Sequence, residues 1–108
     1  MELTIDNLLK ELIARKGSDL YCVVGSPPMI RVHGVGEPVG DKNLTPQDTE
    51  KLAMDILNDE QKKEIIKDPE INLAYGMPGI GRFRGNIYKQ RGTFAMVYRR
   101  VEVIVPTI

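Results

Sequence analysis

The feature that most constrains the fold is a stretch of alternating residues, 81–100, with a glycine near its middle. In its first half, arginines and other polar residues occupy the even positions, and apolar residues or glycine occupy the odd ones. This is the period of a strand with one buried face. Residues 89–92 predict a turn, because Gly92 can adopt a positive φ. A second alternating run follows, so the sequence predicts an antiparallel hairpin.

The predicted hairpin is strongly basic, although the chain is not. Its basic residues are Arg82, Arg84, Lys89, Arg91, Arg99 and Arg100, and it contains no acidic residue. The whole chain has 15 basic and 15 acidic residues, so bulk attraction to nucleic acid or to a membrane surface is not expected. Arginine matches phosphate or carboxylate oxygens two at a time, which makes the hairpin a candidate anion site. The alternative is an ordinary solvated sheet face with surface ion pairs.

Three other segments have the apolar spacing and caps of helices. They cover about residues 5–16, 46–57 and 60–67. We expect Gly17 to end the first and Thr45 to begin the second with a capping box. Asp59 is the expected cap of the third, which has only Ile65 and Ile66 as anchors and should be the least stable helix.

Strands are expected over 18–25, 29–32, 37–39 and 70–75, in addition to the hairpin. The predicted order is α-β-β-β-α-α-β-β-β. Because tight turns join the strands, we expect an α+β domain with an antiparallel sheet and about three helices on one face or end. The predicted core residues are Leu8, Leu12, Leu20, Leu52, Ile56, Phe83 and Ile87.

Two segments approach known chemical motifs without completing them. Residues 76–83 have the glycine spacing of a phosphate-binding loop, but arginine and phenylalanine stand where lysine and a hydroxyl residue are needed, and a strand follows. Cys22 and His33 are a conceivable nucleophile and base, but an apolar strand and a turn favour a buried thiol and a surface imidazole. Asp19 is expected to cap the turn between the first helix and strand.

The composition also narrows the protein class. One cysteine and one histidine predict neither a disulfide framework nor a structural zinc site. The first residues lack a basic region followed by a long apolar run, so we expect no signal peptide or membrane span, and a cytoplasmic protein.

Several segments resemble, in the same order, the motifs of the type IV pilus retraction ATPases, the PilT family of the GspE/PilT secretion ATPase superfamily. The matching segments are 17–20 and 25–34 ("SDLH…G.PP.IRVDG"), 56–61 ("ILN.EQ"), and 82–86 with 90–92 ("RFRVN…QRG"). Arg99 matches the arginine that closes the "V.R.IP" segment. There are departures: Tyr21 replaces a usual His, His33 a usual Asp and Gly85 a common Val, and 99–102 lack the Ile-Pro.

This resemblance implies a PAS-like N-terminal domain over 1–100, with 101–108 as the end of the last strand and the start of a linker to an absent RecA-like ATPase domain. In this family the domain packs on the motor domain of the neighbouring subunit in a homohexamer, and its arginines approach the γ-phosphate of ATP. The matching residues are Arg84 and Arg99, with Arg82 and Arg91 as outer candidates.

The leading hypothesis is therefore a regulatory and ring-assembly domain for pilus retraction and twitching motility. The resemblance implies ATP and Mg²⁺ for the full-length protein, none bound by this chain alone, and no ATPase activity of the chain in isolation. It also implies an indirect link to the pilus platform at the inner membrane, without nucleic acid or membrane insertion.

Two alternatives belong to other classes. The first is a module that binds RNA or other single-stranded nucleic acid, because the hairpin interleaves charge with aromatic rings. The residues concerned are Arg82, Phe83, Tyr88, Arg91 and Phe94. The second is a stand-alone enzyme that uses Cys22, which requires a reactive thiol at neutral pH.

Overall fold

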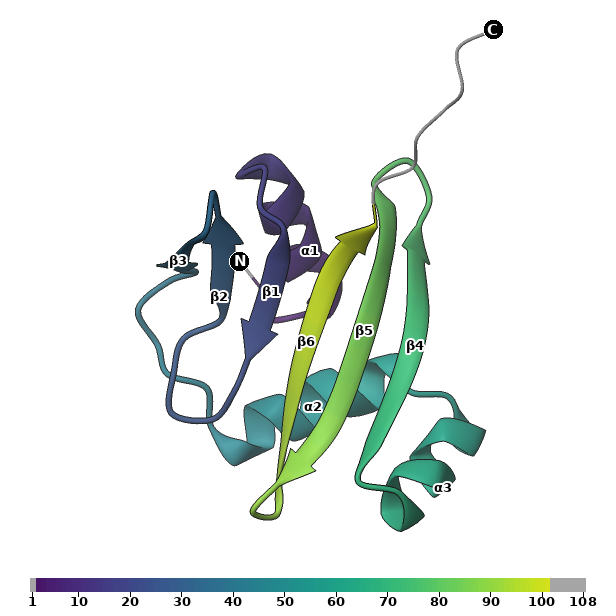
Figure 1. Ribbon diagram of the computed structural model, residues 1–108. Coiled ribbons are helices and arrows are strands. Elements are labelled where there is room, and N and C mark those ends of the chain that lie inside the picture. The colour runs from purple at the N-terminus through teal and green to yellow at the C-terminus, as the bar shows by residue number, and fades with distance from the viewer. Residues whose placement is uncertain (1, 102–108) are drawn as a thin grey trace, which may run out of the picture.

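Residues 2–101 are described by a computed structural model and form three helices and a six-stranded sheet (Figure 1). In chain order the elements are α1 (Ile5–Ala14), β1 (Asp19–Cys22), β2 (Met29–Val32), β3 (Val35–Pro38), α2 (Pro46–Ile56), α3 (Asp59–Lys67), β4 (Glu70–Met77), β5 (Gly81–Gln90) and β6 (Thr93–Val101). The observed element order and the α+β class are those predicted from the sequence, so both predictions are confirmed. The predicted linker falls almost wholly on 102–108, which lie outside the described residues.

The strands lie in the order β3-β2-β1-β6-β5-β4, so β6, the last of the described strands, is central and pairs with β1, the first. Every neighbouring pair is antiparallel. The pairing of β1 with β6 joins the N-terminal strands to the basic hairpin of β5 and β6. The sheet is therefore continuous across both halves of the chain.

Two hairpins are tighter than the sequence predicts. Arg91 and Gly92 form the link between β5 and β6, with φ angles of 53° and 81°. His33 and Gly34 link β2 to β3 in the same way, with φ angles of 49° and 78°. Two residues with positive φ match the twist of the paired strands. As a result β3 begins two residues earlier than expected.

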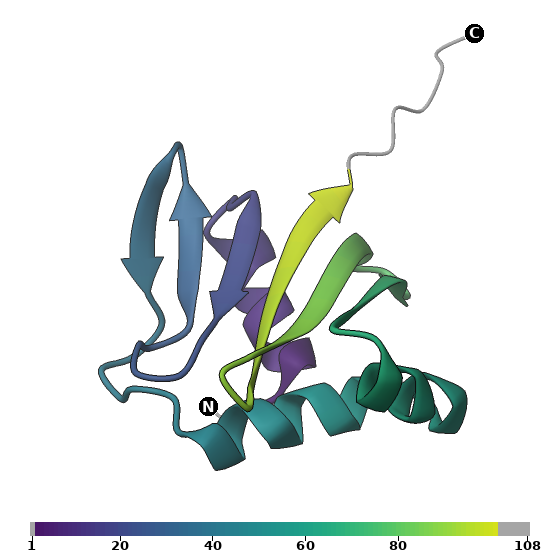
Figure 2. The ribbon, with the colours of Figure 1, turned by 60° about the horizontal axis from the view of Figure 1, so that its bottom comes forward.

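The helices cover one side of the sheet. In Figure 1, α1 and α2 lie behind the strands, and Figure 2 shows α2 running along the foot of the sheet. We call the helix-covered side the inner face and the opposite side, which no described helix covers, the outer face. The predicted core residues are buried on the inner side, except that Ile56 is only partly buried. None of the described helices has the length and apolar character needed to cross a bilayer.

Reciprocal side-chain hydrogen bonds begin α2 and α3. The hydroxyl of Thr45 accepts from the backbone N–H of Asp48, whose carboxylate accepts from the N–H of Thr45, so the predicted capping box is confirmed. Asn58 and Gln61 make the same arrangement at α3. The prediction that Asp59 caps α3 is therefore wrong, because the amide of Asn58 supplies the cap.

Two further details correct the predictions from sequence. The left-handed residue after α1 is Lys16, with φ of 58°, and not Gly17. Glycine is needed at 17 for space, because a Cβ there would lie 2.5 Å from Cγ2 of Ile30. Ile66 is 75% exposed, so Ile65 alone anchors α3 in the core.

Candidate functional site

The register of the basic hairpin sets Arg84 directly opposite Arg99. Both side chains lie on the outer face, because the neighbouring Phe83 and Tyr98 occupy the inner face and are buried. Residues directly opposite in an antiparallel pair have Cβ atoms about 4.5–5.5 Å apart. Arg82 lies two residues before Arg84 on the same face, roughly 7 Å away along the strand. Three of the four predicted arginines therefore gather at one end of the outer face.

Arg91 does not belong to this group. It forms part of the β5–β6 turn, at the other end of the hairpin, roughly 20 Å along the strand from Arg84. Two other basic residues of the hairpin point to the inner side. Lys89 places its amine 5.4 Å from the centroid of the Phe94 ring, and Arg100 lies opposite the buried Phe83. The six basic residues are thus spread over both faces and both ends of the hairpin.

Asp19, the first residue of β1, joins the arginine group from the neighbouring strand. It lies opposite Arg99 on one side and opposite Arg31 on the other. Its Oδ1 accepts from Nε of Arg99 at 3.1 Å, and its Oδ2 accepts from the hydroxyl of Ser18 at 2.7 Å. The expectation that Asp19 caps the preceding turn is wrong, because its carboxylate bonds across the sheet to β6.

Arg31 and Tyr21 also lie on the outer face, and neither was predicted as part of the site. Arg31 lies opposite Asp19, and its guanidinium carbon is 5.3 Å from the centroid of the Tyr21 ring. Such stacking holds an arginine by cation–π attraction. The alternation of Leu20 and Ile30 with polar neighbours indicates the outward direction of Tyr21 and Arg31. It gives no sign that β1 pairs with β6 of the basic hairpin.

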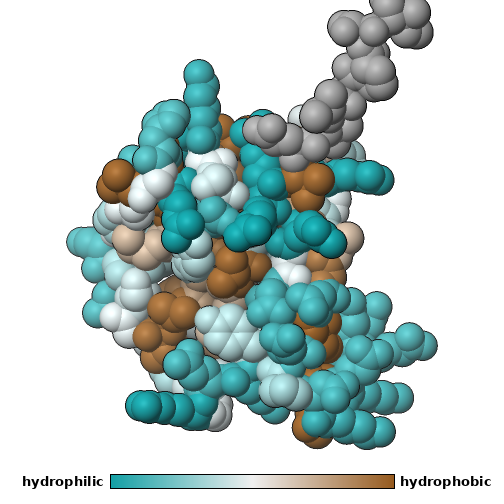
Figure 3. Space-filling model, in the orientation of Figure 1, coloured by the Kyte–Doolittle hydropathy of each residue, from teal (hydrophilic) through white to brown (hydrophobic). Residues whose placement is uncertain are grey.

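Small neighbouring side chains leave the outer face hollowed around Arg84. One hollow of about 270 Å³ is lined by Asn72, Arg84, Gly85, Asn86, Val97 and Arg99. A second, of about 420 Å³, is lined by Ala74, Tyr75, Gly76, Arg82, Phe83, Arg84 and Val101. Figure 3 shows hydrophilic side chains gathered over the upper part of this face, above a smaller hydrophobic area.

The charges at this end of the outer face are unbalanced. Among the described residues, four guanidinium groups, those of Arg31, Arg82, Arg84 and Arg99, accompany one carboxylate, that of Asp19. Like charges set directly opposite each other destabilise a sheet. An oxyanion between the arginines would relieve this repulsion and fit the planar fork of the guanidinium group. The arrangement is suited to binding phosphate or carboxylate oxygens.

The cysteine does not meet the requirements of a nucleophile. Cys22 is fully buried on the inner face, and burial raises the pKa of its thiol to about 12. The register of β1 and β2 places His33 beyond the Asp19 end of the pair, whereas Cys22 lies at the other end. Among residues 2–101, no three His, Cys, Asp or Glu side chains come together as a metal site.

The aromatic residues proposed for nucleic-acid stacking are divided between the faces. Phe83 is 1% exposed in the core, and Phe94 packs against the core on the same side. Tyr88 lies on the outer face with Arg82. No continuous platform of these rings is formed, so the structure gives no specific support to the RNA-binding alternative.

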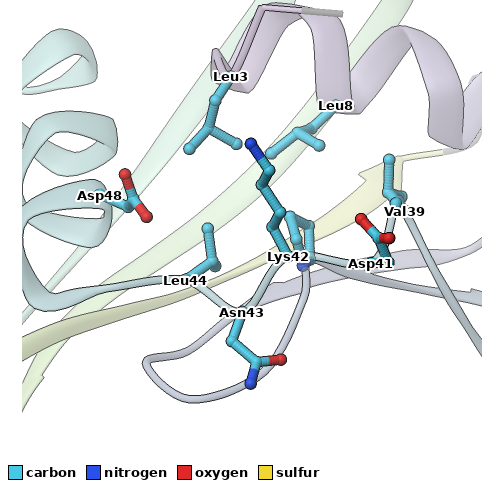
Figure 4. A pocket seen from close by; sticks show the side chains of 10 residues that line it. Leu3, Leu8, Val39, Asp41, Lys42, Asn43, Leu44 and Asp48 are labelled. Carbon is cyan, nitrogen blue, oxygen red and sulfur yellow. The ribbon is translucent and has the colours of Figure 1, made fainter.

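The near miss to a phosphate-binding loop, residues 76–83, joins two strands and precedes no helix. A separate pocket of about 500 Å³ lies between α1 and the loop that precedes α2. Figure 4 shows the side chain of Lys42 reaching toward Leu3 and Leu8 in this pocket. None of the arginines of the outer face lines it. The hollowed, arginine-bearing outer face therefore remains the candidate site.

The fold and the site together define a class: a small α+β domain that presents opposed arginines on an open sheet face. No protein-family model matches the chain. It is 35% identical over 103 residues to the type IV pilus ATPase PilU of Pseudomonas aeruginosa. This match covers 95% of this chain and 27% of PilU. It is 33% identical over 104 residues to the type IV pilus retraction ATPase PilT of the same organism. That match covers 96% of this chain and 30% of PilT.

Solved structures show the same relationship. The crystal structure of the pilus retraction motor PilT with bound ADP superposes with a TM-score of 0.87 at 33% identity, over 97% of this chain and 31% of that one. The Legionella pneumophila ATPase DotB shares the fold, with a TM-score of 0.77 at 19% identity, over 94% of this chain and 29% of that one.

The chain spans about 30% of the length of the curated relatives PilU and PilT. Over nearly their whole length, the 108 residues are similar to the N-terminal part of PilT-like type IV pilus ATPases. The resemblance stated from the sequence motifs is confirmed.

Proposed function

We propose that this chain is the regulatory and ring-assembly domain of a hexameric ATPase that powers type IV pilus retraction. Arg84 and Arg99 act on the γ-phosphate of ATP held by the motor domain of the neighbouring subunit, with Arg82 at the edge of the site. Arg91, at the far end of the hairpin, has no direct part in this contact.

The observation that carries the proposal is the direct opposition of Arg84 and Arg99 on a face that no described helix covers. Like charges directly opposite each other are unfavourable. Asp19 pairs with Arg99 only, so among residues 2–101 no carboxylate pairs with Arg84. The described residues offer no phosphate loop at a helix N-terminus, so the domain supplies arginines to a nucleotide that other residues bind.

In this proposal ATP and Mg²⁺ are bound by the motor domain. This chain's own residues contribute only positive charge at the terminal phosphate. An arginine delivered across an interface stabilises the charge that spreads over the phosphate oxygens, by about 10³–10⁵ in rate in known cases. A head-to-tail contact of this type closes into a ring. The same assembly places the protein in the cytoplasm, against the pilus platform of the inner membrane.

Two substitutions in the full-length protein test the proposal. Arg84→Ala and Arg99→Ala should each lower steady-state ATP turnover by about tenfold or more, with little change in nucleotide affinity, because the contact forms mainly in the transition state. Lysine should not rescue either position, since a point charge does not reproduce the guanidinium fork.

Arg100→Ala is the matched control, because Arg100 is in the same hairpin but points to the inner side. It should leave turnover unchanged. Wild-type turnover in both outer-face variants, or an equal loss in Arg100→Ala, would contradict the proposal.

A further inference from the structure

We propose that Asp19 is a positioning residue for Arg99. Its carboxylate holds the Nε edge of the guanidinium group and leaves both terminal amino groups to bind an oxyanion. This inference rests on the proposed function of Arg99 and adds a residue from another strand to the same site.

The ion pair joins a buried anchor to an exposed cation. The side chain of Asp19 is 6% exposed, and that of Arg99 is 71% exposed. The contact uses Nε of Arg99, at 3.1 Å from Oδ1. Arginine has five N–H donors, and the four on its terminal nitrogens form the fork that grips an oxyanion. Asp19 therefore orients the group from behind without occupying its binding edge.

The carboxylate is itself held in place. The hydroxyl of Ser18 donates to Oδ2, so both oxygens of Asp19 have a partner. A buried carboxylate needs such partners, because isolated charge is costly away from water. Rotation of Asp19 away from Arg99 would break these contacts, which makes it a rigid support.

The other arginines of the face are not held in this way. Arg31 lies over the ring of Tyr21, although it is also opposite Asp19. Among residues 2–101, Arg84 makes no ion pair. Ordering a long side chain before a ligand arrives lowers the entropy lost on binding. Arg99 is thus the preorganised member of the opposed pair, whereas no ion pair among residues 2–101 holds Arg84.

A simpler role for Asp19 is to reduce the positive charge of the face. The two roles predict opposite signs for Asp19→Asn. If Asp19 only neutralises charge, its removal makes the face more positive and should strengthen its attraction for phosphate. If Asp19 positions Arg99, its removal should weaken the action of Arg99 in spite of the added positive charge.

The first test observes the hydrogen bond directly, in the 108-residue chain and without nucleotide. The Nε–H signal of Arg99 in ¹⁵N NMR should be resolved and slow to exchange with water, and Asp19→Asn should make it exchange faster. Glu11→Gln is the matched control, because Glu11 accepts from Nε of Arg15 at 2.9 Å on α1, away from the outer face. It should leave the Arg99 signal unchanged.

An Arg99 signal that Asp19→Asn does not alter would overturn the inference. If Asp19→Asn fails to fold, Ser18→Ala replaces it, because loss of the hydroxyl frees one side of the carboxylate. Ser18→Ala should speed the exchange of the same Nε–H group, and no change there would also overturn the inference.

The second test is a double-mutant cycle in the full-length protein. Asp19→Asn should lower kcat by about two- to tenfold without raising KM, which corresponds to reordering one long side chain. In the Arg99→Ala background it should have no further effect. An equal loss in both backgrounds, or a rise in turnover, would overturn the positioning role.

The two tests separate the two proposals. Wild-type turnover in Arg99→Ala alone would overturn the proposed function. The NMR signal would still support or overturn the hold of Asp19 on Arg99, because it does not depend on turnover.

Discussion

At the scale of single residues, Gly85 and Tyr98 face each other across β5 and β6 and determine how closely the two strands pack. A Cβ on Gly85 would lie 2.8 Å from Cε1 of Tyr98 and 3.3 Å from Cδ1 of Leu73. The hydroxyl of Tyr98 is buried without a partner among the described residues, and burial raises its pKa. The ring is therefore retained for its packing over the glycine.

Gly85→Val should lower the free energy of unfolding by about 1–3 kcal/mol, because the added methyl groups overpack the core against Tyr98. Urea denaturation of the 108-residue chain measures this change. Gly76→Val is the matched control: it is also in a strand, and a Cβ there meets nothing within 4 Å. Its stability should be unchanged or slightly higher. Equal effects at the two glycines would show that Tyr98 imposes no packing constraint on residue 85.

At the scale of whole elements, α3 is the most weakly anchored helix. Ile65 is its only buried residue, whereas α2 buries Thr49, Leu52 and Ala53. Local opening needs little energy where few apolar contacts are lost. Backbone amides of α3 should therefore exchange with deuterium faster than those of α1 or α2. Protection of α3 equal to that of α2 would contradict this prediction.

Local patterns were enough to predict most elements. The hairpin of β5 and β6 follows from the alternation of residues such as Phe83 and Arg84, and α2 follows from its capping box at Thr45. These signals act over a few residues, so they are visible in the sequence. The β1–β6 pairing depends on contacts between residues 80 apart, such as Asp19 and Arg99, and no local pattern specifies it.

In the candidate site too, local patterns predicted some positions, and long-range strand pairing determined the others. The alternation placed Arg82 and Arg84 on the outward side of the predicted hairpin. It left open which of Arg99 and Arg100 faces the same way, and the register of β5 and β6 selects Arg99. The predicted turn at 89–92 already contained Arg91, and the structure places it there, away from Arg84. Only the family resemblance made Arg91 an outer candidate. Asp19 and Arg31 were missed as partners, since only the strand order brings β1 and β2 beside the hairpin.

At the scale of the whole molecule, the central position of β6 gives the domain its two distinct faces. The inner face carries the core and the helices (Figure 1), and the outer face carries the opposed arginines. This division allows one face to hold the domain together while the other meets a partner. The central claim is that the partner is the nucleotide-bearing motor domain of a neighbouring subunit.

Complementation in mixed rings tests that claim most directly. Full-length chains with Arg99→Ala are mixed with full-length chains whose phosphate-binding loop is inactivated, and ATP turnover is compared with that of each chain alone. If Arg99 acts on the neighbour's nucleotide, some intact arginines face intact loops in the mixture, and turnover should exceed that of both homogeneous rings. A mixture no more active than its components would contradict action across the subunit interface.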